Sequence, residues 1–197
     1  KVYHLNIGQP DILTPECGLE AARNLDRKIL EYSPSQGHLS LRTKLVSYYA
    51  EYGIDLSPDE IIVTTGGSEA VMFAYMACLD PGDEIIVTDP SYANYMAFAI
   101  SAGAVVKSVK TNIEDGFRLP SVEEFEKQIT PKTKAILICN PNNPTGYLYT
   151  RNEMRQIRDI VRKHNLFLFS DEVYRDFIYT KAPYISAFHL EGIEQNV

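Results

Sequence analysis

Side chains capable of hydrogen bonding and proton transfer follow two apolar runs in this sequence. Asn143 comes a few residues after the apolar run 135–138. Asp171 and Tyr174 come shortly after the apolar run 166–169. Short apolar runs of this kind are typical of strands buried in a parallel sheet. Because open α/β sheets bind ligands at the carboxyl ends of their strands, an amide, a carboxylate and a phenol are predicted to meet in one crevice.

These three groups suit a substituted pyridine ring such as that of pyridoxal phosphate. Asn143 and Tyr174 can each donate a hydrogen bond to a phenolic oxygen of the ring. Asp171 can keep the pyridine nitrogen protonated, and the protonated ring then acts as an electron sink. Each residue taken alone also has a structural alternative: a turn before Pro144 for Asn143, a cap for Asp171 and a half-buried core position for Tyr174.

A glycine-rich turn offers a site for an anion. Gly66, Gly67, Ser68 and Glu69 follow the apolar segment 61–64 and open a predicted helix. Free backbone N–H groups and the positive end of the helix dipole favour a phosphate there. The alternative is a plain strand-to-helix turn with Ser68 as the N-cap. The turn has no Walker lysine and no G-x-G-x-x-G pattern, which disfavours nucleotide binding.

Tyr92 places an aromatic side chain near the same crevice, because it closely follows the predicted strand 84–88. An aromatic face stacked on a planar cofactor contributes about 0.5–1.5 kcal/mol beyond area burial. The alternative is a core position at the start of a helix.

Helices and strands alternate along most of the chain. Capping boxes at Ser121 and Thr150 mark two later helix starts, and the second helix reaches about Lys163. Periodicity predicts further helices over 15–31, 38–52, 67–79 and 92–102, and strands over 61–64, 84–88, 104–109, 135–138 and 166–169. Such alternation predicts parallel βαβ units, so the expected fold class is α/β, with three layers (αβα) around a mainly parallel sheet.

The composition is that of a globular, core-forming chain: 197 residues, 45% hydrophobic and 23% charged. A net charge of -7 argues against a nucleic-acid or membrane partner. The three cysteines are widely separated, so no metal or redox site is predicted. No signal peptide or spanning apolar stretch is visible, which predicts a cytoplasmic protein. Neither Lys1 nor Val197 looks like a natural terminus, and we expect a piece of a larger protein.

Taken in order, these motifs resemble those of the class I/II aminotransferases, fold type I pyridoxal-phosphate-dependent enzymes of the aspartate aminotransferase type. The resemblance extends from the segment 6–11 to Tyr174. It implies an enzyme that uses pyridoxal 5'-phosphate to transfer an amino group from an amino acid to a 2-oxo acid. It also implies a homodimer with a shared active site.

The resemblance assigns roles to individual residues. Asp171, at the pyridine nitrogen, and Tyr174, at the phenolic oxygen, would be catalytic. Other cofactor contacts would come from Gly67, Ser68 and Glu69 at the phosphate, Tyr92 on the ring face, Asn143 at the phenolic oxygen and Tyr32 at the phosphate of the neighbouring subunit. Gly8 would lie near the substrate, and Arg175 is a weaker candidate for a phosphate contact.

One family feature is missing. The lysine that forms a Schiff base with the cofactor lies on a later strand in this family, and no lysine here follows a buried strand at the crevice. We therefore interpret residues 31–197 as an incomplete major domain that binds the cofactor, and residues 1–30 as a segment that belongs to or leads from the small domain. By itself the chain is expected to be inactive and either self-associated or completed by a partner polypeptide.

The resemblance also implies details of the backbone. The strand starting at Ile61 should not pair with those at Glu84 or Ala135, because two later strands lie between them in the family. Cis peptide bonds are expected before Pro90 and Pro144.

Two other functions fit the same cofactor site. One is a pyridoxal-phosphate-dependent carbon–sulfur lyase, which would release pyruvate and ammonia. The other is the aminotransferase-like effector domain of a transcription regulator, which would require a winged-helix segment upstream of Lys1.

Overall fold

The computed structural model describes residues 8, 10 and 12–197. The chain divides into two compact units, Lys1–Pro34 and Ser35–Val197. The predicted division into 1–30 and 31–197 as parts of two domains stays a prediction. In the first unit, helix α1 spans Glu16–Arg23 and buries no residue. The helix predicted over 15–31 is therefore too long: a short helix without a buried face has little beyond local propensity to extend it.

The second unit contains a sheet of four parallel strands in the order β2-β1-β3-β4. The strands are β1 (Glu84–Asp89), β2 (Val105–Lys110), β3 (Thr133–Cys139) and β4 (Phe167–Asp171). These four strands confirm the predicted ones, and each end agrees within two residues. The parallel order also confirms the predicted α/β class.

The fifth predicted strand, 61–64, is not formed. Ile61 has an extended backbone, but Val63 donates its N–H to the carbonyl of Gln36 rather than to a neighbouring strand. An extended segment becomes a strand only when a second strand bonds to it, and neither β1 nor β3 does so here. The expectation that Ile61 would not pair with these strands is therefore confirmed.

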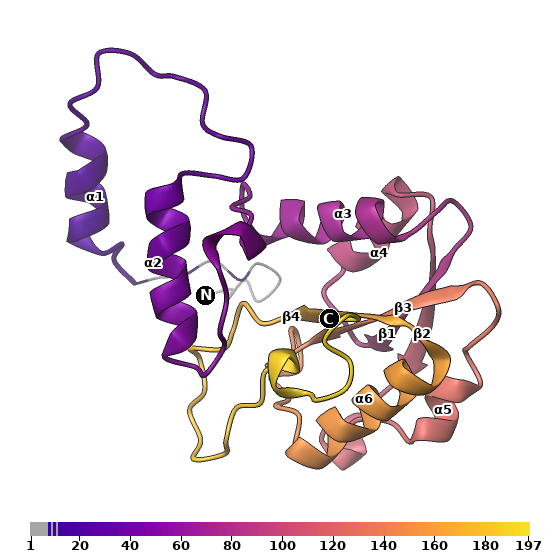
Figure 1. The fold of residues 1–197 in the computed structure, drawn as a ribbon. Coiled ribbons are helices and arrows are strands. Elements are labelled where there is room, and N and C mark those ends of the chain that lie inside the picture. The colour runs from indigo at the N-terminus through magenta and orange to yellow at the C-terminus, as the bar shows by residue number, and fades with distance from the viewer. Residues whose placement is uncertain (1–7, 9, 11) are drawn as a thin grey trace, which may run out of the picture. The chain divides into compact units, whose positions relative to one another are not determined.

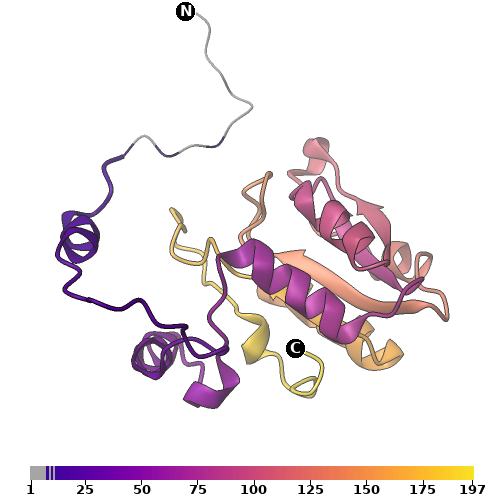
Figure 2. The same ribbon diagram turned by 90° about the horizontal axis from the view of Figure 1, so that it is seen from above.

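Helices cover both faces of the sheet (Figure 1). Helices α3 (Gly67–Cys78) and α4 (Asn94–Ser101) lie on one face, and α5 (Val122–Glu126) and α6 (Arg151–His164) lie on the other. Figure 2 shows α3 lying over the strands. The unit also contains α2 (Leu39–Ala50) and the short 3-10 helices η1 (Pro58–Glu60), η2 (Ile113–Asp115) and η3 (Ala187–His189).

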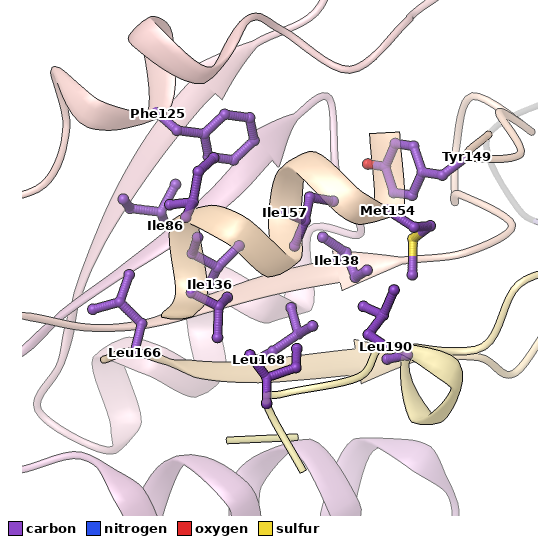
Figure 3. Close-up of a cluster of buried hydrophobic side chains, with 14 of the residues drawn as sticks. Ile86, Phe125, Ile136, Ile138, Tyr149, Met154, Ile157, Leu166, Leu168 and Leu190 are labelled. Atoms are coloured by element: carbon purple, nitrogen blue, oxygen red, sulfur yellow. The ribbon is translucent and has the colours of Figure 1, made fainter. Parts of the chain in front are cut away.

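Two hydrophobic clusters hold these layers together. Alternate strand residues face opposite helices: Ile86 and Ile136 pack toward α5 and α6, whereas Ile85 and Leu137 pack toward α3 and α4. Figure 3 shows the first cluster, in which side chains of α6 meet those of the strands. β1 and β3 are buried on both faces, as expected of central parallel strands.

The two predicted capping boxes differ. At α6, Thr150 accepts the backbone N–H of Glu153, and Glu153 accepts the N–H of Thr150 in return. At α5, the side chain of Ser121 caps nothing, although Ser121 is the N-cap residue. The box predicted at Ser121 is therefore wrong: α5 is a five-residue helix whose first turn is closed by backbone bonds alone.

Candidate active site

The carboxyl ends of β1, β3 and β4 lead into one cavity of about 210 Å³. Six of the residues predicted for the site line it: Gly67, Ser68, Tyr92, Asn143, Asp171 and Tyr174. Val71, Tyr95, Phe98 and Val173 complete the lining. The structure thus brings together groups from four separate segments, because parallel strands end at the same edge of the sheet.

One part of the cavity lining is the start of α3. Gly66, the N-cap, has a φ of 82°, a conformation that favours glycine. No side chain caps this helix, so its first N–H groups remain available to a ligand. Ser68 is the second residue of α3 and not its N-cap, which leaves its hydroxyl at the cavity.

Asn143 and Tyr174 meet in the lining of the cavity. The amide nitrogen of Asn143 lies 3.3 Å from the hydroxyl oxygen of Tyr174 and donates to it. The loop that carries Asn143 is held by its buried neighbours. Asn140 bonds Ile185 and Tyr149 through its side chain, and the Oδ1 atom of Asn142 accepts from Thr145. Two asparagines of this loop are therefore structural, and the third reaches the cavity.

The peptide bonds before Pro90 and Pro144 are cis, as predicted, and so is the bond before Pro141.

Asp171 is fixed by two hydrogen bonds. The hydroxyl of Tyr95 donates to its Oδ2 atom at 2.6 Å, and the N–H of Val173 donates to its Oδ1 atom at 3.1 Å. The sheet register pairs Cys139 with Asp171, which puts the end of β3 beside this carboxylate. The carboxylate is thus an oriented acceptor at a strand end, and each oxygen keeps a lone pair for a further partner.

Tyr95 is a site residue that the sequence interpretation missed. Its side chain is buried, and burial is the main cause that raises its pKa above the ordinary tyrosine value. Tyr95 therefore remains a neutral donor to Asp171. The available signal was its position three residues after Tyr92, on the same face of a helix start, but that spacing also fits a core residue.

Tyr92 lines the cavity beside Tyr95. The two rings meet edge to face, with centroids 5.4 Å apart. The hydroxyl of Tyr92 accepts from the amide of Asn94 at 2.7 Å. The ring of Tyr92 is half-buried, so an aromatic face remains available to a ligand.

Three predicted residues are not among those that line the cavity. The carboxylate of Glu69 accepts the N–H of Thr65 at 2.6 Å and braces the turn before α3, a structural role. Tyr32 is fully exposed and, like Gly8, belongs to the first unit. The roles of Tyr32 and Gly8 therefore stay predictions.

Two further features of the described part of the chain bear on chemistry. Burial raises the pKa of the Cys139 thiol to about 11, and the thiol donates to the carbonyl of Pro141, so it is not a ready nucleophile. Among the described residues, no group of three His, Cys, Asp or Glu side chains could hold a metal ion. Within the same residues, no helix is long and apolar enough to cross a membrane.

The donor set fits pyridoxal phosphate. The lining of the cavity combines an uncapped helix start that suits an anion, a fixed carboxylate, and an amide and a phenol that bond each other. An aromatic ring is available to cover a planar ligand.

Comparison with known proteins agrees with this arrangement. The model of the family described as "Aminotransferase class I and II" matches residues 1–195. The aspartate aminotransferase of Thermotoga maritima is 41% identical over 181 residues, which cover 91% of this chain and 48% of that protein. The aromatic-amino-acid aminotransferase 2 of Thermococcus litoralis is 36% identical over 195 residues, which cover 98% and 50%.

Solved structures show the same fold. The crystal structure of the Thermotoga maritima aspartate aminotransferase aligns with a TM-score of 0.89 at 39% identity, over 97% of this chain and 51% of that one. The aromatic aminotransferase of Pyrococcus horikoshii aligns with a TM-score of 0.91 at 36% identity, over 98% and 52%. The chain therefore spans about half the length of the relatives it matches. With the family model matching nearly every residue, this chain belongs to the class I and II aminotransferases.

Proposed function

We propose that this chain forms the cofactor site of a pyridoxal-phosphate-dependent aminotransferase, which transfers an amino group from an amino acid to a 2-oxo acid. The observation that carries the proposal is the fixed carboxylate of Asp171, which shares one cavity with the start of α3 and with the Asn143–Tyr174 pair. The names of the relatives, aspartate and aromatic-amino-acid aminotransferases, support the same class of substrates.

Each side chain has a definite task in this proposal. Asp171 holds a proton on the pyridine nitrogen, and Tyr95 and Val173 keep its carboxylate oriented. When bound, pyridoxal phosphate supplies the protonated ring that stabilises negative charge on the α-carbon of the amino acid.

The other residues of the cavity bind and orient the cofactor. Tyr174 and Asn143 donate hydrogen bonds to the phenolic oxygen, and the N–H groups at the start of α3 hold the phosphate together with Ser68. Tyr92 covers one face of the ring and excludes water from it.

The proposed activity requires a lysine that forms a Schiff base with the cofactor. No lysine is among the residues that line the cavity, so we propose that the covalent lysine comes from outside residues 1–197. We further propose a cytoplasmic homodimer in which Tyr32 reaches the phosphate in the neighbouring subunit and Gly8 lies near the substrate.

Binding of pyridoxamine 5'-phosphate tests the cofactor site directly, because this ligand has no aldehyde and needs no lysine. We expect the 197-residue chain to bind the ligand saturably, with binding measured from the change in ligand absorbance. Asp171→Ala should lose much of this affinity. Asp159→Ala, at an exposed position on α6, is the control and should bind normally. Equal affinities of the Asp171→Ala variant and the unmodified chain would overturn the role of Asp171.

A second measurement tests the proposal that the Schiff-base lysine lies outside residues 1–197. After addition of pyridoxal 5'-phosphate and reduction with borohydride, we expect no specific label on a lysine of residues 1–197. A stoichiometric label mapped to one lysine of this chain would contradict the proposal.

A further inference from the structure

Arg175, in the turn after β4, carries a positive charge that packs against tyrosines of α2 and of the residues just after it. The guanidinium of Arg175 lies over three rings, with its Cζ atom 5.4 Å from the centroid of Tyr48, 4.9 Å from that of Tyr49 and 4.8 Å from that of Tyr52. We call Tyr48, Tyr49 and Tyr52 the tyrosine anchor. Arg175 is only 8% exposed, so little water competes with the attraction between the cation and the ring faces.

Asp176 attaches the same turn to the same anchor. Tyr48 donates its hydroxyl to one carboxylate oxygen of Asp176 at 2.8 Å, and Tyr52 donates to the other oxygen. These hydrogen bonds, that of Tyr52 foremost, hold the pKa of Asp176 below its ordinary value. A cation and an anion that are adjacent in sequence are therefore bound by the same anchor: Arg175 contacts all three tyrosines, and Asp176 bonds Tyr48 and Tyr52.

The attachment bears directly on Tyr174, the residue before Arg175. The N–H of Arg175 donates to the carbonyl of Glu172 at 3.0 Å, and that of Phe177 donates to the carbonyl of Tyr174 at 2.9 Å. The side chain of Tyr174 is 36% exposed, so core packing alone does not hold it. Its direction depends on the backbone of a turn that the anchor fixes.

The phosphate contact considered for Arg175 from the sequence stays a prediction, because Arg175 lines a second cavity that Gly67 and Asp171 also line. Arg175 is not among the residues that line the cavity with Ser68 and Asn143. Its charge faces the anchor and Glu172, whose carboxylate lies 3.4 Å away.

We propose that Arg175 is a positioning residue: held by the tyrosine anchor, it directs the hydroxyl of Tyr174 toward Asn143 and toward the phenolic oxygen of bound cofactor. This inference rests on the proposed function for the role of that oxygen. A purely structural Arg175 would affect stability and leave the chemistry of the bound ligand unchanged.

The test uses Arg175→Met, which removes the cation and keeps an unbranched apolar stem. Glu172 retains other donors in this variant, because Ser186 and the N–H of Ala187 also bond to it. The readout is the pH at which the 3-hydroxyl group of bound pyridoxamine 5'-phosphate ionises, followed by absorbance. Hydrogen bonds from Tyr174 and Asn143 stabilise the ionised form, so their loss should raise this pH.

A double-mutant comparison separates positioning from stability. We expect Arg175→Met and Tyr174→Phe each to weaken binding about tenfold, as for the loss of one hydrogen bond, and to raise the ionisation pH by similar amounts. The double variant should be little worse than Tyr174→Phe alone, because both changes remove the same interaction. Additive effects, or an unchanged ionisation pH in Arg175→Met, would overturn the positioning role.

Variants at Tyr49 provide a milder test, in case Arg175→Met folds poorly. Tyr49→Phe keeps the ring under the guanidinium and should behave like the unmodified chain. Tyr49→Leu removes the ring and should shift the ionisation in the same direction as Arg175→Met. Equal behaviour of Tyr49→Leu and Tyr49→Phe would count against the anchor.

Hydrogen exchange distinguishes failure of this inference from failure of the proposed function. If the unmodified chain does not bind pyridoxamine 5'-phosphate, the cofactor proposal fails. The amides of 174–177 then test the anchor by themselves: they should exchange faster in Tyr49→Leu than in Tyr49→Phe. Equal exchange would overturn the anchor as well.

Discussion

At the scale of single residues, the contact between Tyr95 and Asp171 joins two positions 76 residues apart in the sequence. A hydrogen bond to a charged group contributes about 1.5–3 kcal/mol. We expect Tyr95→Phe to lower the free energy of unfolding by roughly this amount, measured by urea denaturation, and to weaken binding of pyridoxamine 5'-phosphate. The matched control is Tyr92→Phe, whose hydroxyl partner Asn94 is exposed. A change of similar size in both variants would contradict a special role for Tyr95.

Cys139 predicts a dependence of stability on alkaline pH. Burial raises the pKa of this thiol from 9.0 to about 11. Because the raised pKa belongs to the folded state, the thiol favours folding below pH 9, and this contribution is lost as the pH rises toward 11. A shift of two pKa units corresponds to roughly 2–3 kcal/mol.

The measurement is the urea midpoint between pH 8 and pH 11 in the unmodified chain and in Cys139→Ala. We expect a shallower fall in Cys139→Ala, since the titrating group is gone. Cys17→Ala should retain the full slope, because Cys17 is exposed. An identical slope in all three proteins would show that other groups, such as Tyr149, control the alkaline transition.

At the scale of elements, the two helix starts with the same sequence pattern differ in what their side chains do. Thr150 caps α6 and Ser121 caps nothing at α5. Loss of a working N-cap side chain costs about 0.5–2 kcal/mol. We expect Thr150→Ala to lower the free energy of unfolding by about 1 kcal/mol and Ser121→Ala to change it by less than about 0.5 kcal/mol. Urea denaturation of the two variants measures both changes in the free energy of unfolding. Equal decreases would mean that Ser121 caps its helix in solution.

Glu153 explains why the α6 cap is the stronger one. Beyond Thr150, its carboxylate accepts the hydroxyl of Tyr147 at 2.8 Å and the N–H of Leu119 at 3.0 Å. The cap therefore ties the start of α6 to the loop before it and to the loop before α5.

At the scale of the whole molecule, the two edges of the sheet differ in chemistry. β2, at one edge, carries Lys107 and Lys110, and charged edge residues discourage pairing with another chain. β4, at the other edge, carries Phe167 and Phe169, whose rings stack with centroids 6.3 Å apart. A mostly apolar cavity of about 410 Å³ adjoins β4, and Phe169, Tyr75, Asp171 and Arg175 are among the residues that line it.

Asn196 already bonds the backbone of Leu166 and Leu168 at this edge, so we expect the 197-residue chain to self-associate through the apolar side chains of β4. Phe167→Lys should reduce the apparent mass measured by size-exclusion chromatography with light scattering. Val105→Lys, on β2 at the opposite edge, is the matched control and should leave the mass unchanged. A monomer at micromolar concentration before any substitution would contradict the expectation.

Much of this arrangement could be predicted from local signals. Apolar runs located the four strands, and polar residues at the end of β4 or shortly after β3 and β4 located Asn143, Asp171 and Tyr174, because a strand and the loop that follows it are contiguous in sequence. The family resemblance added the function and the cis bonds. The predictions that failed concern the extent of elements and one cap: α1 is shorter than its pattern, Ser121 does not cap, and no strand forms over 61–64.

The sequence by itself determined the α/β class, the strand ends and the residue types at the cavity, since each depends on short-range periodicity and on the fixed polarity of parallel strands. Only the tertiary structure decided that Tyr95 orients Asp171 and that Arg175 rests on the tyrosine anchor. These contacts join residues far apart in the chain, and they form because the sheet register and the packing of α2 and α4 bring their side chains together. No local pattern encodes such a juxtaposition, because it depends on the packing energy of the whole unit.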